Sequence, residues 1–194
     1  MPAAISPSPR AVVLVGFMGA GKSSVGRALA ERLNWLFEDL DDRVERREGR
    51  TIAEIFRDSG EAEFRRAEQA ALEQMLEELH GGAKIVALGG GAFVKKDNAA
   101  LLRAAGVPAV FLDARVEELW RRCQEHMSGA GRERPLLKTF EPFRALYQSR
   151  RKSYLQARVK IETDGCPVEA IAAEIVERLG LREIGTRTEQ GEAE

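Results

Sequence analysis

The chain has 194 residues, a length that suits one domain with a buried core. Its 44% hydrophobic and 31% charged residues are typical of a soluble globular protein. The net charge of -1 argues against nucleic acid or an anionic membrane as a partner, and no apolar run approaches the ~20 residues of a membrane span.

The first ten residues, MPAAISPSPR, contain three prolines and no apolar core of signal-peptide length. We therefore expect a flexible N-terminal tail over 1–10. The polar residues 182–194 lack periodicity and predict a flexible C-terminal tail. Two well-separated cysteines, Cys123 and Cys166, have no metal-binding spacing and favour free thiols in a reducing, cytoplasmic location.

Between the two tails, apolar runs alternate with segments of helical periodicity. The strand candidates are 11–16, 35–39, 84–91, 107–113 and 157–163, and the helical patterns cover 25–33, 64–79, 115–126, 140–156 and 171–179. Strands separated by helices predict an α/β fold, in which a five-stranded parallel sheet is the middle of three α/β/α layers. We expect one domain over 11–181.

A glycine-rich motif follows the first strand. Residues 16–23 read GFMGAGKS and match the phosphate-loop pattern G-x-x-x-x-G-K-[ST]. The glycines let backbone N–H groups point at a phosphate, and the helix that begins near Lys22 adds its positive end. Lys22 would reach the β- and γ-phosphates, and the Ser23 hydroxyl would ligate Mg²⁺. A chance match in a glycine turn is the alternative, but the flanking strand and helix favour nucleotide binding.

Carboxylates follow the second strand, in the sequence FEDLDDRVE. Asp39 and Asp41 would project to one side if the chain stayed extended there. Such acids can hold Mg²⁺ through water or orient a hydroxyl group. The alternative is an acidic helix N-terminus, which Asp42 fits, and this fragment leaves the two interpretations equally supported.

Two further motifs have a chemical interpretation beside a structural one. In GEAEFRRAE, residues 60–68, Arg65 and Glu68 are i,i+3 neighbours, so the glutamate either fixes an anion-binding guanidinium or forms a surface ion pair. In LGGG, residues 88–91, three glycines either expose backbone N–H groups to a ligand or form a plain loop.

A basic region near the end of the chain predicts a mobile lid over about 127–139. The sequence SGAGRERPLLK, residues 128–138, combines glycines, basic residues and a proline, and includes Arg134. The surrounding residues 121–160 hold 11 Lys or Arg against 3 Asp or Glu, a balance that complements a polyphosphate. An ordinary basic surface loop is the alternative.

Taken together, these motifs resemble the shikimate kinase family, small P-loop NTPase kinases of the nucleoside-monophosphate-kinase type. The resemblance runs from about 12 to 179 and rests on GFMGAGKSSVGRALAERL, D-x-D at 39–41, EFRRAE at 63–68, LGGG at 88–91 and RPLL at 134–137. It implies transfer of the ATP γ-phosphoryl group to the 3-hydroxyl of shikimate, with one Mg²⁺ per ATP. A gluconate-type kinase and a non-catalytic nucleotide-binding switch are the alternatives.

The resemblance also implies a role for individual residues. ATP would be bound by Gly19, Ala20, Gly21, Lys22, Ser23, Ser24 and Arg134, and the metal by Ser23 and Asp39. Shikimate would be bound by Asp41, Arg65, Gly89, Gly90, Gly91 and Arg150. Lys22, Asp41 and Arg134 would be catalytic, Glu68 would steady Arg65, and Phe56 and Phe64 would line the apolar side of the site.

The chain departs from the family pattern in two segments. Leu40 stands between the two aspartates, where the family often has Ser or Thr. After Arg150 the family commonly has x-P-L-Y, whereas this chain has RKSY, which makes Arg151 a competitor for the role of Arg150. Pro167 is a candidate for contact with adenine. We expect a monomer, because no large apolar interface is recognisable.

Overall fold

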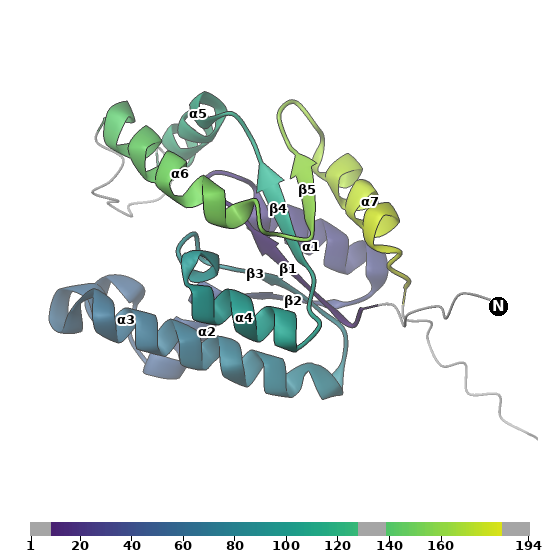
Figure 1. The fold of residues 1–194 in the computed structure, drawn as a ribbon, viewed down its shortest axis with the longest axis horizontal. Coiled ribbons are helices and arrows are strands. Elements are labelled where there is room, and N and C mark those ends of the chain that lie inside the picture. Colours follow the sequence, from purple (N-terminus) through teal and green to yellow (C-terminus); the bar gives the residue numbers. More distant parts are fainter. Residues whose placement is uncertain (1–8, 128–138, 184–194) are drawn as a thin grey trace, which may run out of the picture.

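The computed structural model describes residues 9–127 and 139–183. The strands are β1 Ala11–Val15, β2 Leu36–Asp39, β3 Lys84–Ala87, β4 Ala109–Asp113 and β5 Val159–Glu162 (Figure 1). The helices are α1 Lys22–Leu33, α2 Leu40–Glu48, α3 Ile52–Glu77, α4 Lys96–Ala104, α5 Val116–Met127, α6 Phe140–Tyr154 and α7 Val168–Leu179. Two short 3₁₀ helices, η1 Glu78–Gly81 and η2 Ala92–Val94, flank β3.

The five strands form one parallel sheet in the order β2-β3-β1-β4-β5. The central strand β1 and its neighbour β4 are buried along their whole length, which explains their uninterrupted apolar sequences. Val13 in β1 lies opposite Val86 in β3 and Ala109 in β4. The predicted α/β fold with five parallel strands is confirmed.

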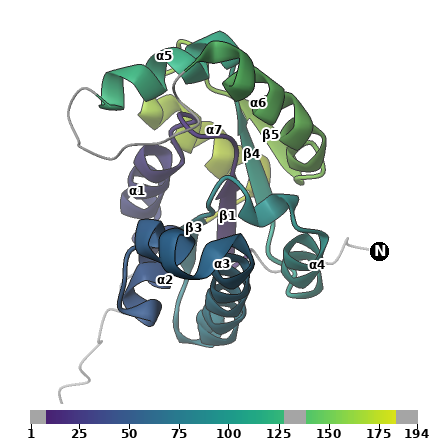
Figure 2. The ribbon, with the colours of Figure 1, turned by 90° about the vertical axis from the view of Figure 1, so that its left-hand side faces the viewer.

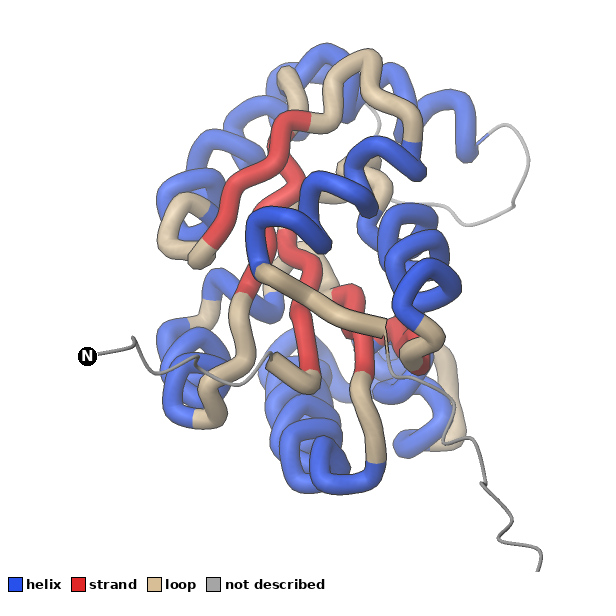
Figure 3. The backbone as a smooth tube through the Cα atoms, turned by 90° about the vertical axis from the view of Figure 1, so that its right-hand side faces the viewer, coloured by secondary structure: helices blue, strands red, loops and turns tan. Residues whose placement is uncertain are grey.

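Helices cover both faces of the sheet. α1 packs against α7, and Figure 2 shows α1 and α4 on opposite sides of β1. Figure 3 shows the strands enclosed by helices from the opposite side. α1 buries Val25, Leu29 and Leu33, an i, i+4, i+8 stripe that matches its amphipathic sequence. None of the helices in the described ranges is long and apolar enough to cross a lipid bilayer.

Because every strand runs in the same direction, the carboxyl ends of all five meet at one edge of the sheet. The glycine-rich loop follows β1 at this edge, Asp39 ends β2, the three glycines follow β3, and Asp113 ends β4. Open α/β sheets bind ligands at this edge.

Three features of the helices were not predicted. α2 and α4 were missed, because each has only nine residues, and α2 is mostly charged and buries only Leu40, Arg43 and Val44. α3 begins at Ile52, earlier than predicted, behind a capping box of Thr51 and Glu54. It breaks at Gly60, which has φ 77° and ψ 178°.

Candidate active site

The glycines of the phosphate loop are required both by backbone conformation and by close packing. Gly19 and Gly21 have φ of 80° and 84°, in the left-handed region, and Gly21 is the N-cap of α1. A Cβ added to Gly19 would lie 2.6 Å from the carbonyl oxygen of Leu119 in α5. One added to Gly16 would lie 2.8 Å from the carbonyl oxygen of Leu112 in β4. The loop therefore keeps its shape only with these glycines.

Lys22 begins α1 and folds back over this loop. Its Nζ donates to the carbonyl oxygens of Gly16, at 3.0 Å, and Phe17, at 3.1 Å. Ala20 is buried behind the loop, whereas Ser24 is exposed in the first turn of the helix. A cation and a helix N-terminus thus face the space that the loop encloses, an arrangement suited to a phosphate group.

Ser23 and Asp39 bring two oxygen donors together between the ends of β1 and β2. The Ser23 hydroxyl donates to Asp39 Oδ2 at 2.9 Å. Within the described residues no group of three or more His, Cys, Asp or Glu side chains is arranged to hold a metal ion. One hydroxyl and one carboxylate are hard donors of the kind Mg²⁺ takes when phosphates and water supply its other ligands, so the pair fits that ion.

The extended geometry considered for Asp39 and Asp41 is wrong, because the chain turns into α2 at Leu40. Asp39 is the N-cap of α2, and its Oδ1 accepts from the Asp41 backbone N–H at 3.1 Å. Asp41, in the first turn, nevertheless lies against the glycine segment 89–91, since a Cβ on Gly89 would be 2.5 Å from Asp41 Oδ1. The acidic residues are therefore a helix N-terminus and line the site.

Arg65 lies against the other end of the glycine segment. A Cβ on Gly91 would be 2.6 Å from its Nη1. Nη1 donates to Glu68 Oε2 at 2.9 Å, and Nη2 donates to Glu61 Oε1 at 3.1 Å. The pKa of Arg65 lies above its ordinary value, since burial, which lowers it, is outweighed by the charges of Glu68 and Glu61. The guanidinium is therefore a fixed cation held by two carboxylates.

Glu68 is 1% exposed, and its Oε1 has no hydrogen-bond partner among the residues that the structure describes. Burial raises the pKa of Glu68, and the charge and hydrogen bond of Arg65 offset part of that rise. The charged form of a buried carboxylate needs a cation beside it, and here that cation is Arg65. The predicted pairing of Glu68 with Arg65 is present.

Of the two consecutive arginines in α6, only one faces the glycine segment. A Cβ on Gly90 would lie 3.5 Å from Arg150 Nη1, while Arg151 Nη2 donates to Asp113 Oδ2 at 2.8 Å. The Tyr154 hydroxyl donates to the Gly90 carbonyl oxygen. Sequence reasoning missed Tyr154, although its position four residues after Arg150 places both on one face of a helix.

Phe56 and Phe64 are in contact, with ring centroids 4.8 Å apart. Phe64 is buried and Phe56 is 40% exposed. The Arg65 guanidinium lies 5.0 Å from the centre of the Phe64 ring, a cation–π distance. The two rings therefore form an apolar wall beside Arg65, and their place in a substrate site stays a prediction.

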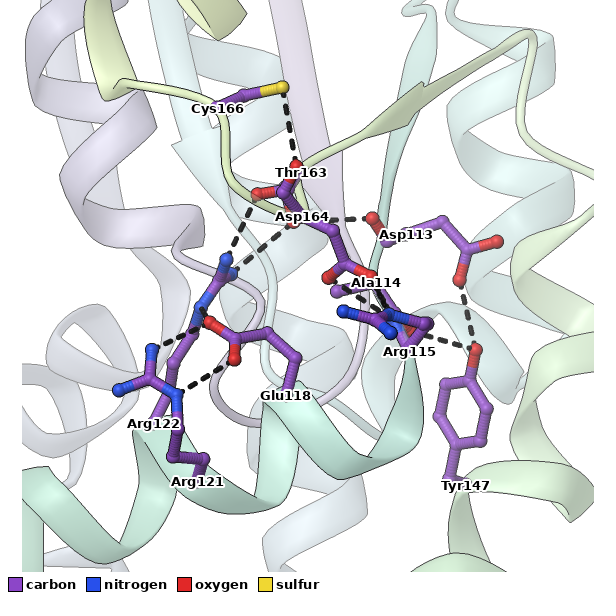
Figure 4. A network of polar contacts seen from close by, with 10 residues as sticks. All are labelled: Asp113, Ala114, Arg115, Glu118, Arg121, Arg122, Tyr147, Thr163, Asp164 and Cys166. Atoms are coloured by element: carbon purple, nitrogen blue, oxygen red, sulfur yellow. Dashed lines mark hydrogen bonds and ion pairs between the residues drawn. The ribbon is translucent and has the colours of Figure 1, made fainter.

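A polar network joins α5 to the loop after β5 (Figure 4). Arg115 Nε donates to Asp164 Oδ2 at 2.7 Å, and Arg122 Nη2 donates to the carbonyl oxygen of Thr163 at 2.9 Å. Pro167 follows in the same loop as the N-cap of α7. Its contact with adenine stays a prediction.

Arg134 and residues 128–138 of the predicted lid lie outside the described residues. The remaining predicted site residues gather at the carboxyl edge of the sheet. The glycine segment connects the phosphate loop to the acidic and basic side chains around residues 89–91. A Cβ on Gly90 would lie 3.8 Å from the Gly16 carbonyl oxygen, which also accepts from Lys22.

A phosphate loop after the central strand, with acidic side chains of β2 and α2 and basic side chains of α3 and α6 at the same edge of the sheet, defines a P-loop kinase. Comparison with known proteins agrees. The family model described as shikimate kinase matches residues 18–180. The shikimate kinase of Cereibacter sphaeroides is 40% identical over 176 residues, which cover 89% of this chain and 84% of that protein. The chain therefore belongs to the shikimate kinase family, whose members are ATP-dependent kinases.

Solved structures give the same relation. Shikimate kinase from Acinetobacter baumannii in complex with shikimate has a TM-score of 0.77 and 34% identity, covering 87% of this chain and 92% of that one. A gluconokinase from Sinorhizobium meliloti 1021, at 21% identity and a TM-score of 0.56 over 90% of this chain and 94% of that one, shares the fold alone.

Proposed function

We propose that this protein transfers the γ-phosphoryl group of ATP to the 3-hydroxyl of shikimate, giving shikimate 3-phosphate and ADP for chorismate and aromatic amino acid biosynthesis. One observation carries the proposal: a Cβ added to the glycine segment 89–91 would come within 3.5 Å of Asp41, Arg65 and Arg150, and within 3.8 Å of the Gly16 carbonyl oxygen of the phosphate loop. An anionic polyol bound on this segment lies next to a nucleotide phosphate.

On the nucleotide side, the loop and the first turn of α1 bind the phosphates of ATP. The contacts come from Gly19, Ala20, Gly21, Lys22, Ser23 and Ser24. Lys22 exchanges its two carbonyl acceptors for phosphate oxygens and stabilises the charge that develops on the transferred group. We assign Arg134 to the same charge on the basis of the RPLL motif.

Ser23 and Asp39 would hold Mg²⁺, the Ser23 hydroxyl directly and Asp39 through water. Bound there, the ion neutralises phosphate charge. The 2.9 Å hydrogen bond between the two side chains supports this assignment, because it places a hydroxyl and a carboxylate oxygen side by side.

On the acceptor side, Arg65 and Arg150 bind the shikimate carboxylate, and backbone N–H groups of Gly89, Gly90 and Gly91 bind a hydroxyl. Asp41 orients the 3-hydroxyl and takes its proton. A bond forms between the 3-oxygen and the γ-phosphorus, and the bond from that phosphorus to the oxygen of ADP breaks. Two arginines fit a carboxylate because each presents a planar fork of donors.

We also propose that residues 11–181 form one kinase domain with a lid over about 127–139, and that the enzyme is a cytoplasmic monomer. The family match over 18–180 falls inside that domain. Cys123, which is buried, and Cys166, which is exposed, are not joined to each other by a disulfide, which agrees with a reducing compartment.

Measuring ADP release from Mg-ATP with shikimate, with gluconate and with neither tests the proposed function. We expect release only with shikimate, and loss of release when EDTA removes the metal. Release with gluconate alone would support the gluconate-type alternative. Tight ATP binding without release in any arm would support a nucleotide switch instead.

A further inference from the structure

A buried carboxylate at the end of β4 holds α6 against the sheet. Asp113 is 4% exposed. Its Oδ1 accepts from the Tyr147 hydroxyl at 2.9 Å, and its Oδ2 accepts from Arg151 Nη2 at 2.8 Å. Lys160 Nζ, from β5, lies 3.6 Å from the same Oδ2. Figure 4 shows Asp113 and the Tyr147 hydroxyl facing one another from β4 and α6.

The two partners of Asp113 on α6 are also bonded to each other. Tyr147 and Arg151 are one helical turn apart, and Arg151 Nε donates to the Tyr147 hydroxyl oxygen at 3.1 Å. Burial, together with the bond to Asp113, raises the pKa of Tyr147 to about 12. We call this closed triangle the Asp113 anchor; it consists of Asp113, Tyr147 and Arg151. It fixes the rotation of the second half of α6 relative to β4.

The same rotation sets the direction in which the Arg150 side chain points. It precedes Arg151 by one residue and therefore points to a different side of the helix, toward Gly90. Its guanidinium lies 5.9 Å from the centre of the Phe17 ring, and that ring packs edge-on against Tyr147 with centroids 5.5 Å apart. Tyr147 thus contacts both the carboxylate of the anchor and the ring beneath Arg150.

We propose that Asp113, acting through Tyr147 and Arg151, is a positioning residue that directs Arg150 at the carboxylate of the acceptor substrate. The inference rests on the proposed function. It concerns the segment where this chain departs from the family pattern x-P-L-Y. A proline inside α6 would remove a backbone N–H, whereas here α6 continues to Tyr154 and Arg151 supplies the link to β4.

A double-mutant cycle between Arg151 and Arg150 tests the anchor. Arg151→Met keeps the aliphatic stem and removes the guanidinium. We expect it to raise the shikimate KM about five- to tenfold, with the ATP KM unchanged, because one charge-assisted contact is misaligned rather than deleted. In an Arg150→Met background the same change should raise the shikimate KM no further, because the residue it positions is gone.

Two more variants keep the test decisive. Tyr147→Phe removes only the hydroxyl and should raise the shikimate KM in the same way. It replaces Arg151→Met in the test if that variant folds poorly. Arg144→Met, at an exposed position of the same helix, is the matched control and should leave both KM values unchanged.

Equal factors for Arg151→Met with and without Arg150 would overturn the anchor, as would an Arg150→Met variant with an unchanged shikimate KM. An active wild type with either result leaves the proposed function standing. A wild type that releases no ADP with shikimate overturns the proposed function and the inference together.

Discussion

At the scale of single residues, Arg65 illustrates how ion pairs within the protein hold a cation in the site before a ligand binds. Its guanidinium is held by Glu68, which is buried, and by Glu61, whose side chain is 68% exposed. The buried partner fixes the direction of the fork, and the exposed partner covers nitrogen atoms that a substrate carboxylate would use. The two ion pairs therefore have opposite expected effects on substrate binding.

Arg65→Ala should raise the shikimate KM about 10- to 100-fold, because a charge-assisted contact to a carboxylate is lost. The ATP KM should change little, since Arg65 lies on the acceptor side. Steady-state kinetics with each substrate varied separately measures both constants. Arg66→Ala is the control, because Arg66 is 73% exposed and forms its ion pair with Glu63. Equal changes in both KM values would remove Arg65 from the carboxylate site.

Glu61→Gln should have the opposite effect and lower the shikimate KM about two- to fivefold. The neutral amide competes less well than a carboxylate for the Arg65 fork, and the pair is weak because Glu61 is exposed. The same kinetic assay measures the change. A raised shikimate KM would show that Glu61 helps to orient Arg65 and does not compete with the substrate.

At the scale of elements, regular apolar patterns predicted the sheet, and the types and spacing of polar residues predicted the site motifs. Neither signal predicted the short charged helices. α2 was missed as a helix because its buried residues are too few to show periodicity. The sequence therefore left its aspartates equally open to an extended pair and to an acidic helix N-terminus, and the second is correct. The placement of Arg150 and Arg151 was also beyond the sequence. Consecutive residues on a helix look alike until the partner of one, here Asp113, is known.

The turn after β3 shows how an element depends on the absence of side chains. Gly89→Ala would place a Cβ 2.5 Å from Asp41 Oδ1 and 3.3 Å from Glu68 Oε1, so Asp41 must move. We expect kcat to fall about 10- to 100-fold if Asp41 has its proposed role of orienting the reacting hydroxyl.

Gly90→Ala is the matched control within the same turn. Among the described residues, the nearest atom to its Cβ would be Arg150 Nη1 at 3.5 Å, an ordinary contact, so the loss of kcat should be much smaller. Pre-steady-state measurement of phosphoryl transfer compares the two variants. Similar losses for both would show that the turn, and not the position of Asp41, limits the reaction.

At the scale of the whole molecule, a second polar cluster joins parts of the chain that are distant in sequence. Arg43 in α2, which is 9% exposed, donates to Glu38 in β2 at 2.9 Å and to Glu78 in η1. Lys84 in β3 lies 3.1 Å from Glu78. The cluster therefore links α2, which carries Asp41, to β2, β3 and η1.

Arg43→Ala should lower the free energy of unfolding by about 2 kcal/mol, because it removes the most buried cation bonded to Glu38, while Arg46 and Lys84 still pair with that carboxylate. Urea denaturation measures the change. Arg46→Ala removes a 69% exposed partner of the same Glu38 and should cost under about 1 kcal/mol. Comparable losses from the two variants would show that burial does not strengthen the cluster.

Gly90 is shared by the two halves of the site, and this has a thermodynamic consequence. Its position between the Gly16 carbonyl and Arg150 means that a ligand which shifts one neighbour changes the surroundings of the other. Occupancy by nucleotide should then alter the dissociation constant of the acid, and linkage requires the acid to alter that of the nucleotide by the same factor. Titration calorimetry measures the dissociation constant of each ligand with and without the other, which is added in a non-hydrolysable or product form. The two constants should change by the same factor.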